Sequence, residues 1–446
     1  MDSIDSVRIV RLSKARGPGY SRRMTKATID KPARRALLAA CCIALSSCGL
    51  VETPVAELLT DVPQMAIYAA AFNTQQDRFR VNVSYDERVA ETLERRADKP
   101  SLVIGRYLKS SRSRSSFQAL DHLFSDLIVN PSSFYAGLLE LGNYEGRQIL
   151  LPVSFNLPLI VFDRGLEPSM PDGFVIDLAD LESLGAGLNK SSKASVTNMG
   201  FGPRWSPEFL FSAVGLLGAG FREGAPLRWD REALDSSVAY IRAWSERANG
   251  SAAKEDEFQF KYLYLPEYRS VEEGRIGFAA MSSSEFFVIS EERRASLAIR
   301  WLSRSNSIPV EEDIVYAGIC RKGEGRQAAE AFIKWFYSEE TQKAILEDAK
   351  RYRSIESSFG VAGGFSAIRS VNEKLFPLYY PSLLGKLPPA GYLSPPNVLP
   401  AQWPAMKEAI VLPFLLEQTG PTPPDGDRND ILEARLQAWL KRRSTD

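Results

Sequence analysis

The residue types that most often carry metal, redox or nucleophilic chemistry are scarce in this sequence, which has four cysteines and one histidine. Three of the cysteines, Cys41, Cys42 and Cys48, lie close together near the N-terminus, and Cys320 stands alone. A structural zinc site needs about four convergent nitrogen or sulfur ligands, and a dithiol redox motif needs the Cys-x-x-Cys spacing, which is absent. A Ser-His-Asp triad would depend wholly on His122. We therefore predict no catalytic residues, no metal site, no cofactor and no enzyme activity.

The cysteine cluster belongs to a segment that is typical of a bacterial export signal. Basic residues precede an unbroken apolar run at 36–45, and small residues follow it. The run is roughly half the length that spans a bilayer. The sequence LSSC that ends at Cys48 resembles a lipobox, the motif that leaves a cysteine at the new N-terminus for acylation. We predict that residues 1–47 are a leader, with Met24 as a possible true start, and that Cys48 is lipidated; plain secretion or a retained anchor is the alternative.

The charge balance bears on the partners of the protein. The whole chain has 55 basic and 55 acidic residues, and removal of the basic leader would leave a mature chain with a net negative charge. That charge argues against a nucleic-acid partner, which favours a basic face, and against polybasic membrane adhesion. The protein would instead be held at the cell membrane by the lipid on Cys48, facing the periplasm or the cell exterior. Cys320 would then have no partner for an intramolecular disulfide bond.

The fold class follows from the first elements of the mature chain. Apolar strands are predicted at 55–61, 79–85 and 101–108. Two helices separate these strands, and Thr60 or Asp61 is available to cap the first helix. The order strand, helix, strand, helix, strand favours an α/β fold with a parallel sheet and right-handed crossovers.

Strand and helix patterns continue through the rest of the chain. The segment 147–163 is predicted to form two strands joined by a bend, because it contains proline between two apolar runs. Residues 165–270 are predicted to be mainly helical. Two amphipathic helices follow at 326–350, and Ser338 is placed to cap the second. A proline-rich, irregular segment then leads to a last helix at 431–440.

Four segments, in this order, resemble the sugar-binding group of the extracellular solute-binding protein family 1, which includes maltose-binding protein. They are AAAFNTQQDRFRVNVSY at 69–85, LPVSFNLPLIVFDRGL at 151–166, VEEGRIGFAAMSS at 271–283 and RQAAEAFIKWFYSEETQKAI at 326–345. Their order and spacing carry the resemblance.

The resemblance implies a two-lobed periplasmic-binding-protein fold, in which each lobe is a mainly parallel sheet flanked by helices and the ligand cleft lies between the lobes. The N-terminal lobe would comprise 52–154 plus 300–350, and the C-terminal lobe 155–299 plus 351–446. A sugar or oligosaccharide would bind in the cleft of a monomer. The lobes would then close about a hinge, and the permease subunits of an ABC importer would recognise the closed form.

The side chains that could bind such a solute lie in loops at the ends of the predicted strands, where ligand sites of α/β proteins occur. The candidates are Thr60, Asp61, Arg106, Tyr107, Phe155, Asn156, Trp205, Ser282, Ser283, Glu285 and Tyr316. Ordinary structural roles compete with binding at several of them. Trp205 could pack inside a lobe, Thr60 and Asp61 could only cap a helix, and Arg106 could face solvent.

Two other functions stay open on the sequence alone. A surface lipoprotein with this fold could bind a protein of the host or the envelope instead of a small solute. An importer component could also take a non-sugar solute, such as a peptide, a polyamine, thiamine or a metal chelate. Uptake of free metal is disfavoured because such sites usually use histidine and cysteine ligands.

Overall fold

The parallel strands predicted near the start of the chain belong to a six-stranded sheet in the computed structural model, which describes residues 53–125, 129–192, 195–225 and 227–443. In spatial order the strands are β17 (Phe365–Ser366), β6 (Leu151–Phe155), β16 (Val315–Ile319), β3 (Leu102–Gly105), β1 (Val55–Thr60) and β2 (Arg80–Tyr85). β1 is parallel to both β2 and β3, which confirms the predicted α/β start. β16 enters antiparallel between β3 and β6. The predicted leader 1–47, Met24 and Cys48 lie outside the described residues.

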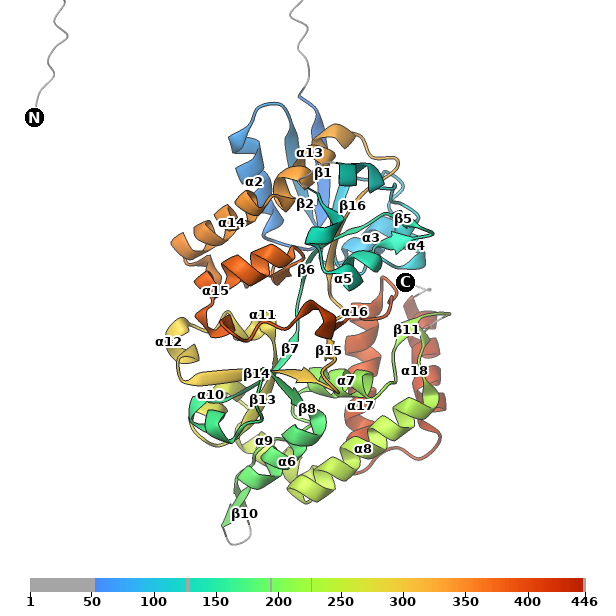
Figure 1. Ribbon diagram of the computed structural model, residues 1–446. Helices are drawn as coiled ribbons and strands as arrows, with labels where there is room; N and C mark the ends of the chain where they lie inside the picture. Colours follow the sequence, from blue (N-terminus) through green and yellow to red (C-terminus); the bar gives the residue numbers. More distant parts are fainter. Residues whose placement is uncertain (1–52, 126–128, 193–194, 226, 444–446) are drawn as a thin grey trace, which may run out of the picture. The chain divides into compact units, whose positions relative to one another are not determined.

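Helices from both ends of the sequence cover this sheet (Figure 1). They are α2 (Met65–Gln75), α3 (Val89–Arg95), α4 (Ser111–Arg114), α5 (Ala136–Glu140), α13 (Arg326–Tyr337), α14 (Glu339–Arg351) and α15 (Phe376–Tyr379). The predicted cap at Ser338 is confirmed, because its Oγ accepts a hydrogen bond from the backbone N–H of Thr341. The predicted cap of α2 is wrong. Its N-cap is Gln64, which makes no capping bond with its side chain, while the Thr60 Oγ1 accepts from the N–H of Val62.

A second, four-stranded sheet has the order β13 (Phe278–Ser282), β7 (Pro158–Asp163), β14 (Leu297–Ser303) and β8 (Val175–Asp177). β7 runs antiparallel to both of its neighbours, and only β14 and β8 are parallel. This sheet is therefore mixed, whereas the sequence led us to expect mainly parallel sheets. Its helices are α6 (Leu178–Leu188), α7 (Pro207–Leu216), α8 (Arg231–Asn249), α9 (Ala252–Lys261), α10 (Glu267–Glu272), α11 (Ser283–Phe286), α12 (Glu291–Arg294), α16 (Trp403–Met406), α17 (Leu412–Thr419) and α18 (Arg428–Arg443).

The helix α18 begins three residues before the predicted start at Ile431, because the Asp427 carboxylate accepts a hydrogen bond from the backbone N–H of Asp430. Besides short 3₁₀ and π-helical turns, the described chain also contains short two-stranded pairs. They are β4 (Asn143–Tyr144) with β5 (Arg147–Gln148), β9 (Lys190–Ser192) with β10 (Ser195–Asn198), β11 (Arg222–Glu223) with β12 (Leu227–Arg228), and β15 (Ile308–Pro309) with β18 (Leu393–Ser394).

The described chain passes between the two sheets three times. In the first passage, β6 of the six-stranded sheet continues almost directly into β7 of the four-stranded sheet (Figure 1). In the second passage, the chain returns from β14 through β15 to β16 of the six-stranded sheet. In the third passage, it leaves the six-stranded sheet after β17 and continues through β18. Backbone hydrogen bonds connect the three passages. The N–H of Glu311 donates to the carbonyl of Asn156 at 3.0 Å, and the N–H of Val310 donates to the carbonyl of Ser394 at 2.9 Å. We call these three passages the crossing.

Sheet membership differs from the predicted lobe division in two places. The predicted boundary at residue 300 falls inside β14, which continues to Ser303 because Trp301–Ser303 pair with β8. Residues after 350 were assigned to the C-terminal lobe, yet Phe365 pairs with Phe155 in the six-stranded sheet. Both corrections depend on strand pairing between segments far apart in the sequence.

The packing of α13 predicts the effect of a core substitution. Phe332 is fully buried and its ring meets that of Phe72 edge-on, with centroids 5.4 Å apart. Replacing Phe332 by alanine should lower the free energy of unfolding by about 3–5 kcal/mol in urea denaturation, because it leaves a cavity. The control Lys343→Ala, on the exposed face of α14, should stay within about 0.5 kcal/mol of wild type. Equal effects of the two substitutions would contradict the packing of α13 described here.

Candidate functional site

A cavity of about 860 Å³ lies beside the crossing, where the ends of several strands meet. Pro158 and Leu159 at the start of β7, Ser282 at the end of β13, and the loop before β16 contribute to its wall, and so do α7, α10 and α11. Tyr107, which follows β3, extends the wall from the six-stranded sheet. The volume falls in the range of roughly 300–1,000 Å³ that is typical of small-molecule sites.

A second cavity of about 360 Å³ adjoins the first. The two share the lining residues Pro158, Ser212, Glu311 and Glu312. The proline-rich segment beyond β18 lines the far side of the second cavity with Pro395 and neighbouring residues. Because the two cavities share part of their lining, a ligand of more than one ring could occupy both.

Trp205 is one of the residues that line the main cavity. Its ring is 8% exposed and stacks on Phe258 with centroids 5.6 Å apart, and its Nε1–H donates to the carbonyl of Glu255 at 3.2 Å. A Cβ at Gly202 would lie only 2.4 Å from the indole ring, so this glycine allows the tight loop. Trp205 therefore combines the packing role and the cavity-lining role that the sequence left as alternatives.

Tyr107 has an unusual backbone conformation at the opposite wall. Its φ is +58°, in the left-handed region that aromatic residues rarely adopt. The side chain packs against both hydrophobic clusters of the protein. Burial, and then the nearby carboxylates Glu312 and Asp313, raise the pKa of its hydroxyl well above the usual value. Strain of this kind is concentrated at functional sites.

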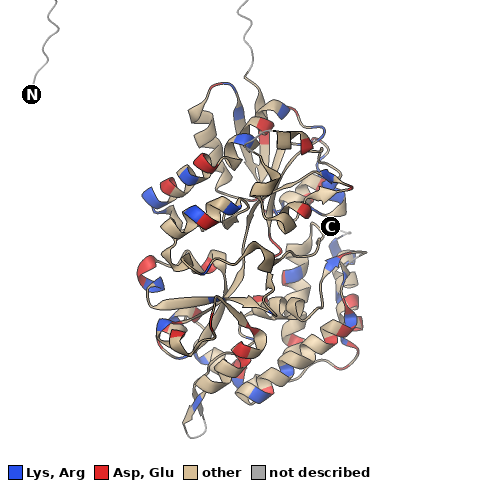
Figure 2. Ribbon diagram, viewed as in Figure 1, with Lys and Arg blue, Asp and Glu red and all other residues tan. Residues whose placement is uncertain are grey.

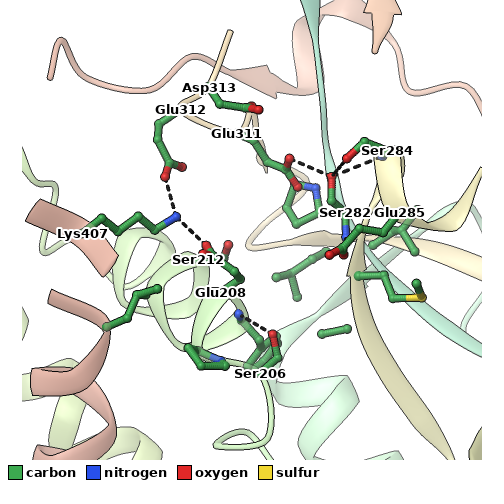
Figure 3. A pocket seen from close by; sticks show the side chains of 18 of the residues that line it. Ser206, Glu208, Ser212, Ser282, Ser284, Glu285, Glu311, Glu312, Asp313 and Lys407 are labelled. Atoms are coloured by element: carbon green, nitrogen blue, oxygen red, sulfur yellow. Dashed lines mark hydrogen bonds and ion pairs between the residues drawn. The ribbon is translucent and has the colours of Figure 1, made fainter. Parts of the chain in front are cut away.

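Three consecutive acidic residues, Glu311, Glu312 and Asp313, form a loop between β15 and β16 that we call the acidic loop (Figure 3). The Glu311 carboxylate accepts a hydrogen bond of 2.8 Å from the hydroxyl of Ser282. Burial, together with the charge of Asp313, raises the pKa of Glu311 well above its usual value. The loop thus places several carboxylates at the point where the crossing meets the cavity.

Lys407 neutralises part of this charge. Its ammonium group bridges Glu312 and Glu208, and the three side chains meet along one edge of the cavity (Figure 3). Burial opposes ionisation of Lys407, but the two carboxylates outweigh it and raise the pKa of the amine. Lys407 is therefore positively charged, and its ion pairs with Glu208 and Glu312 stabilise the charged form.

The acidic loop, Glu208, Glu267 and Lys407 were all missed by the sequence analysis. A usable signal was present, since three acids stand directly before the apolar strand 314–319. Interpreting it requires the sheet order. Because β16 is antiparallel to β3, with Tyr316 opposite Gly105, the start of β16 lies beside the carboxyl end of β3.

The eleven candidates from the sequence fall into four groups. Tyr107, Trp205, Ser282 and Glu285 line the cavity. Asp61 and Arg106 lie directly behind it, where the Arg106 guanidinium contacts Asp61 at 3.6 Å and the cavity-lining Asp313 at 3.3 Å. Arg106 is thus held in an ion-pair network, instead of simply facing solvent.

Asn156 and Ser283 belong to the crossing. The Ser283 hydroxyl donates to the Asn156 Oδ1 at 2.8 Å and accepts from the N–H of Leu157 at 3.1 Å, and the Asn156 amide donates to the carbonyl of Gly363. The two bonds made by the Ser283 hydroxyl are buried, and the bond to Gly363 is partly buried. Both side chains therefore hold the crossing together and do not line the cavity.

Thr60, Phe155 and Tyr316 are buried and do not line the cavity. Phe155 packs between Tyr135 and Phe365. Tyr316 donates its hydroxyl to the carbonyl of Leu138 at 2.8 Å. The alternation of side chains along a strand turns these residues into the core, a direction that their position near strand ends did not reveal.

The residues with reactive side chains have ordinary environments. His122 lies in a short 3₁₀ helix (Asp121–Ser125), and its Nε2 is 3.0 Å from Glu330. Cys320 is buried, and burial raises the pKa of its thiol to about 12. Within the described ranges, no three histidine, cysteine or acidic residues are grouped to hold a metal ion, and no helix is long and apolar enough to cross a membrane.

Comparison with solved structures shows which fold this is. The chain is similar to the sugar-binding protein MalE from Xanthomonas citri, with 10% identity, a TM-score of 0.61, and coverage of 87% of this chain and 98% of that one. It is also similar to an ABC substrate-binding protein from Listeria monocytogenes in complex with cycloalternan, with 12% identity, a TM-score of 0.58, and coverage of 87% and 99%. A third similar structure has mannotriose bound, with 13% identity, a TM-score of 0.56, and coverage of 86% and 99%.

These similarities establish the two-lobed α/β fold of periplasmic binding proteins, as the resemblance in sequence implied. No protein-family profile matches the sequence, and no curated protein matches it at a significant level. At such low sequence identity, structural similarity establishes the fold but does not identify the ligand.

The support behind Trp205 predicts a pH effect on stability. Glu255 is fully buried, and burial raises the pKa of its carboxyl to about 7. The folded protein therefore binds a proton that the unfolded chain releases above pH 4.5, so the free energy of unfolding should fall by up to roughly 3 kcal/mol as pH rises from 4.5 to 8. Glu255→Gln should reduce this fall, as measured by urea denaturation at several pH values. Glu246→Gln, on the exposed face of α8, is the control, and an unchanged profile in Glu255→Gln would count against a buried proton.

Proposed function

We propose that this protein is a solute-binding protein that captures a sugar or oligosaccharide in the cavity beside the crossing and delivers it to an ABC importer. The observation that carries the proposal is the cavity itself. It combines the aromatic residues Tyr107 and Trp205 with the hydroxyl of Ser282 and the carboxylates of the acidic loop. A sugar-binding site needs polar and aromatic groups, because the hydroxyl groups of a sugar require hydrogen-bonding partners and the C–H face of its ring packs on an aromatic surface. The fold shared with sugar-binding proteins supports this assignment.

Binding would be coupled to closure through the crossing. The cavity wall includes the acidic loop, which is itself part of the second passage between the sheets. A solute that touches both Trp205 and Tyr107 gains contacts only when the two walls approach, so it stabilises the closed arrangement. The permease of the importer would then recognise the closed, loaded protein. No residue is assigned a catalytic role in this scheme, and the protein would act as a monomer.

The proposal includes an anchor at the N-terminus. Cleavage of the leader 1–47 would expose Cys48, and a lipid on this residue would hold the binding protein at the cell membrane, facing the periplasm or the cell exterior. An anchored binding protein stays close to its permease, which raises the effective concentration of the loaded form.

Ligand binding can be tested by thermal unfolding with a panel of mono- and oligosaccharides. A ligand at about a hundred times its dissociation constant should add roughly 2.7 kcal/mol to the free energy of unfolding. Trp205→Phe should then weaken sugar binding by about tenfold or more, because Trp205 lines the cavity and a phenyl ring fills less of that wall than an indole. Trp439→Phe is a matched control, since Trp439 is also 8% exposed but lies in α18 and away from the cavity lining. Equal loss of affinity in the two variants would argue against the Trp205 wall.

Anchoring can be tested separately in the cell. Cys48→Ser should abolish incorporation of a labelled fatty acid and release the protein from the membrane fraction, because the only acylated residue in this proposal is removed. Cys42→Ser, six residues earlier in the leader, should leave both unchanged. Lipid labelling that persists in Cys48→Ser would contradict the proposed anchor.

A further inference from the structure

The lining of the main cavity has an unusual balance of charge. Seven of its residues are acidic, whereas Lys407 is its only basic residue. Elsewhere the two signs are mixed, as along α14, where acidic and basic residues follow one another (Figure 2). A neutral sugar binds through hydrogen bonds and ring packing, neither of which requires this excess of acidic residues. The cavity and the fold define the site, and the charge of the wall bears on which ligand it accepts.

The nearby cations do not balance these carboxylates. Lys407 is already shared between Glu208 and Glu312. Arg106, behind the wall, is shared between Asp61 and Asp313. In each of these two aspartates the Oδ1 atom is buried and has no hydrogen-bond partner within the described part of the chain.

Three further carboxylates of the wall have no ion-pair partner among the described residues. Glu311 accepts a hydrogen bond from the hydroxyl of Ser282, and Glu285 accepts one from the backbone N–H of the same residue. Glu267 is half-buried and has no hydrogen-bond partner of its own in the described ranges. Burial and then the charge of Glu285 raise the pKa of Glu267 to about 7, which is the expected response of a carboxyl group without a counter-charge.

We propose, on the basis of the function proposed above, that the ligand of this cavity is a cationic sugar that carries a protonated amino group. The ring would pack on Trp205, and the ammonium group would contact the carboxylates of Glu311 and Glu267, which lack cations of their own. An ammonium on an organic ligand suits the wall because carboxylates from three separate elements, the acidic loop, α10 and α11, lie close together there. Glu311 and Glu285 both accept hydrogen bonds from Ser282, and Glu267 is close enough to Glu285 to feel its charge.

The first test compares ligands that differ only in charge. Isothermal titration calorimetry would measure the affinity of glucosamine, galactosamine, mannosamine and their β-1,4 oligomers against the N-acetylated and the unsubstituted forms of the same sugars. The free amines should bind at least about tenfold more tightly than either neutral form, because charge-assisted hydrogen bonds are stronger than neutral ones. This advantage should shrink as the salt concentration rises.

The second test changes the wall. Glu311→Gln and Glu267→Gln keep the shape and an acceptor oxygen but remove the carboxyl group that could pair with an ammonium as a carboxylate. Each should weaken binding of the amino sugar by about tenfold and leave binding of the neutral sugars unchanged. Glu340→Gln, in the exposed first turn of α14, should affect neither.

The outcomes separate this inference from the proposed function. Neutral sugars that bind as tightly as the amines, or tighter, would overturn the cationic ligand and leave sugar binding intact. Binding of spermidine without any sugar would overturn the amino sugar and the sugar-binding function together, and so would a folded protein that binds none of these compounds. If the protein prefers the amines but the glutamine substitutions do not reduce this preference, the proposed contacts of the ammonium group with Glu311 and Glu267 would be wrong.

Discussion

The ion pairs of Arg106 fix the geometry on which the site depends. Arg106 follows β3, Asp61 follows β1, and Asp313 precedes β16, so one guanidinium holds the ends of three neighbouring strands. Tyr107 then turns sharply into the cavity wall, and the acidic loop is held at the entrance of the crossing. Without this arrangement, the carboxylates of the loop would have no fixed relation to the wall that carries Trp205. A network of this kind is retained for positioning and not for stability alone.

Local patterns in the sequence predicted the elements well. The strand at 55–61, the helix after it and the cap at Ser338 depend on alternation, on helical spacing and on a side chain that bonds its own helix. All of this information lies within a few residues. The places where the prediction differed depend on distant partners. Phe365 joins the first sheet only because it pairs with Phe155, and β14 continues past residue 300 only because β8 pairs with its end.

The candidate site shows the same limit at the level of side chains. Trp205 and Ser282 were found because loops at strand ends are the usual place for ligand contacts. The same rule also selected Tyr316 and Phe155, whose side chains are turned into the core by the pleat of their strands. It missed Lys407, because this residue follows α16 in a segment where no sequence pattern indicates proximity to the acidic loop. The direction in which a side chain points and its distance from residues far away in the sequence are set by the assembled sheets. Both therefore had to come from the structure.

The hydrogen bonds within the crossing have a mechanical consequence. A single flexible linker would allow two lobes to rotate in any direction. Here three passages of the chain are joined side by side by the bonds from Glu311 to Asn156 and from Val310 to Ser394. Segments joined side by side by hydrogen bonds can bend together, but they resist twisting and sliding past one another. In the proposed closure, these hydrogen bonds would restrict the directions in which the two walls of the cavity can approach each other.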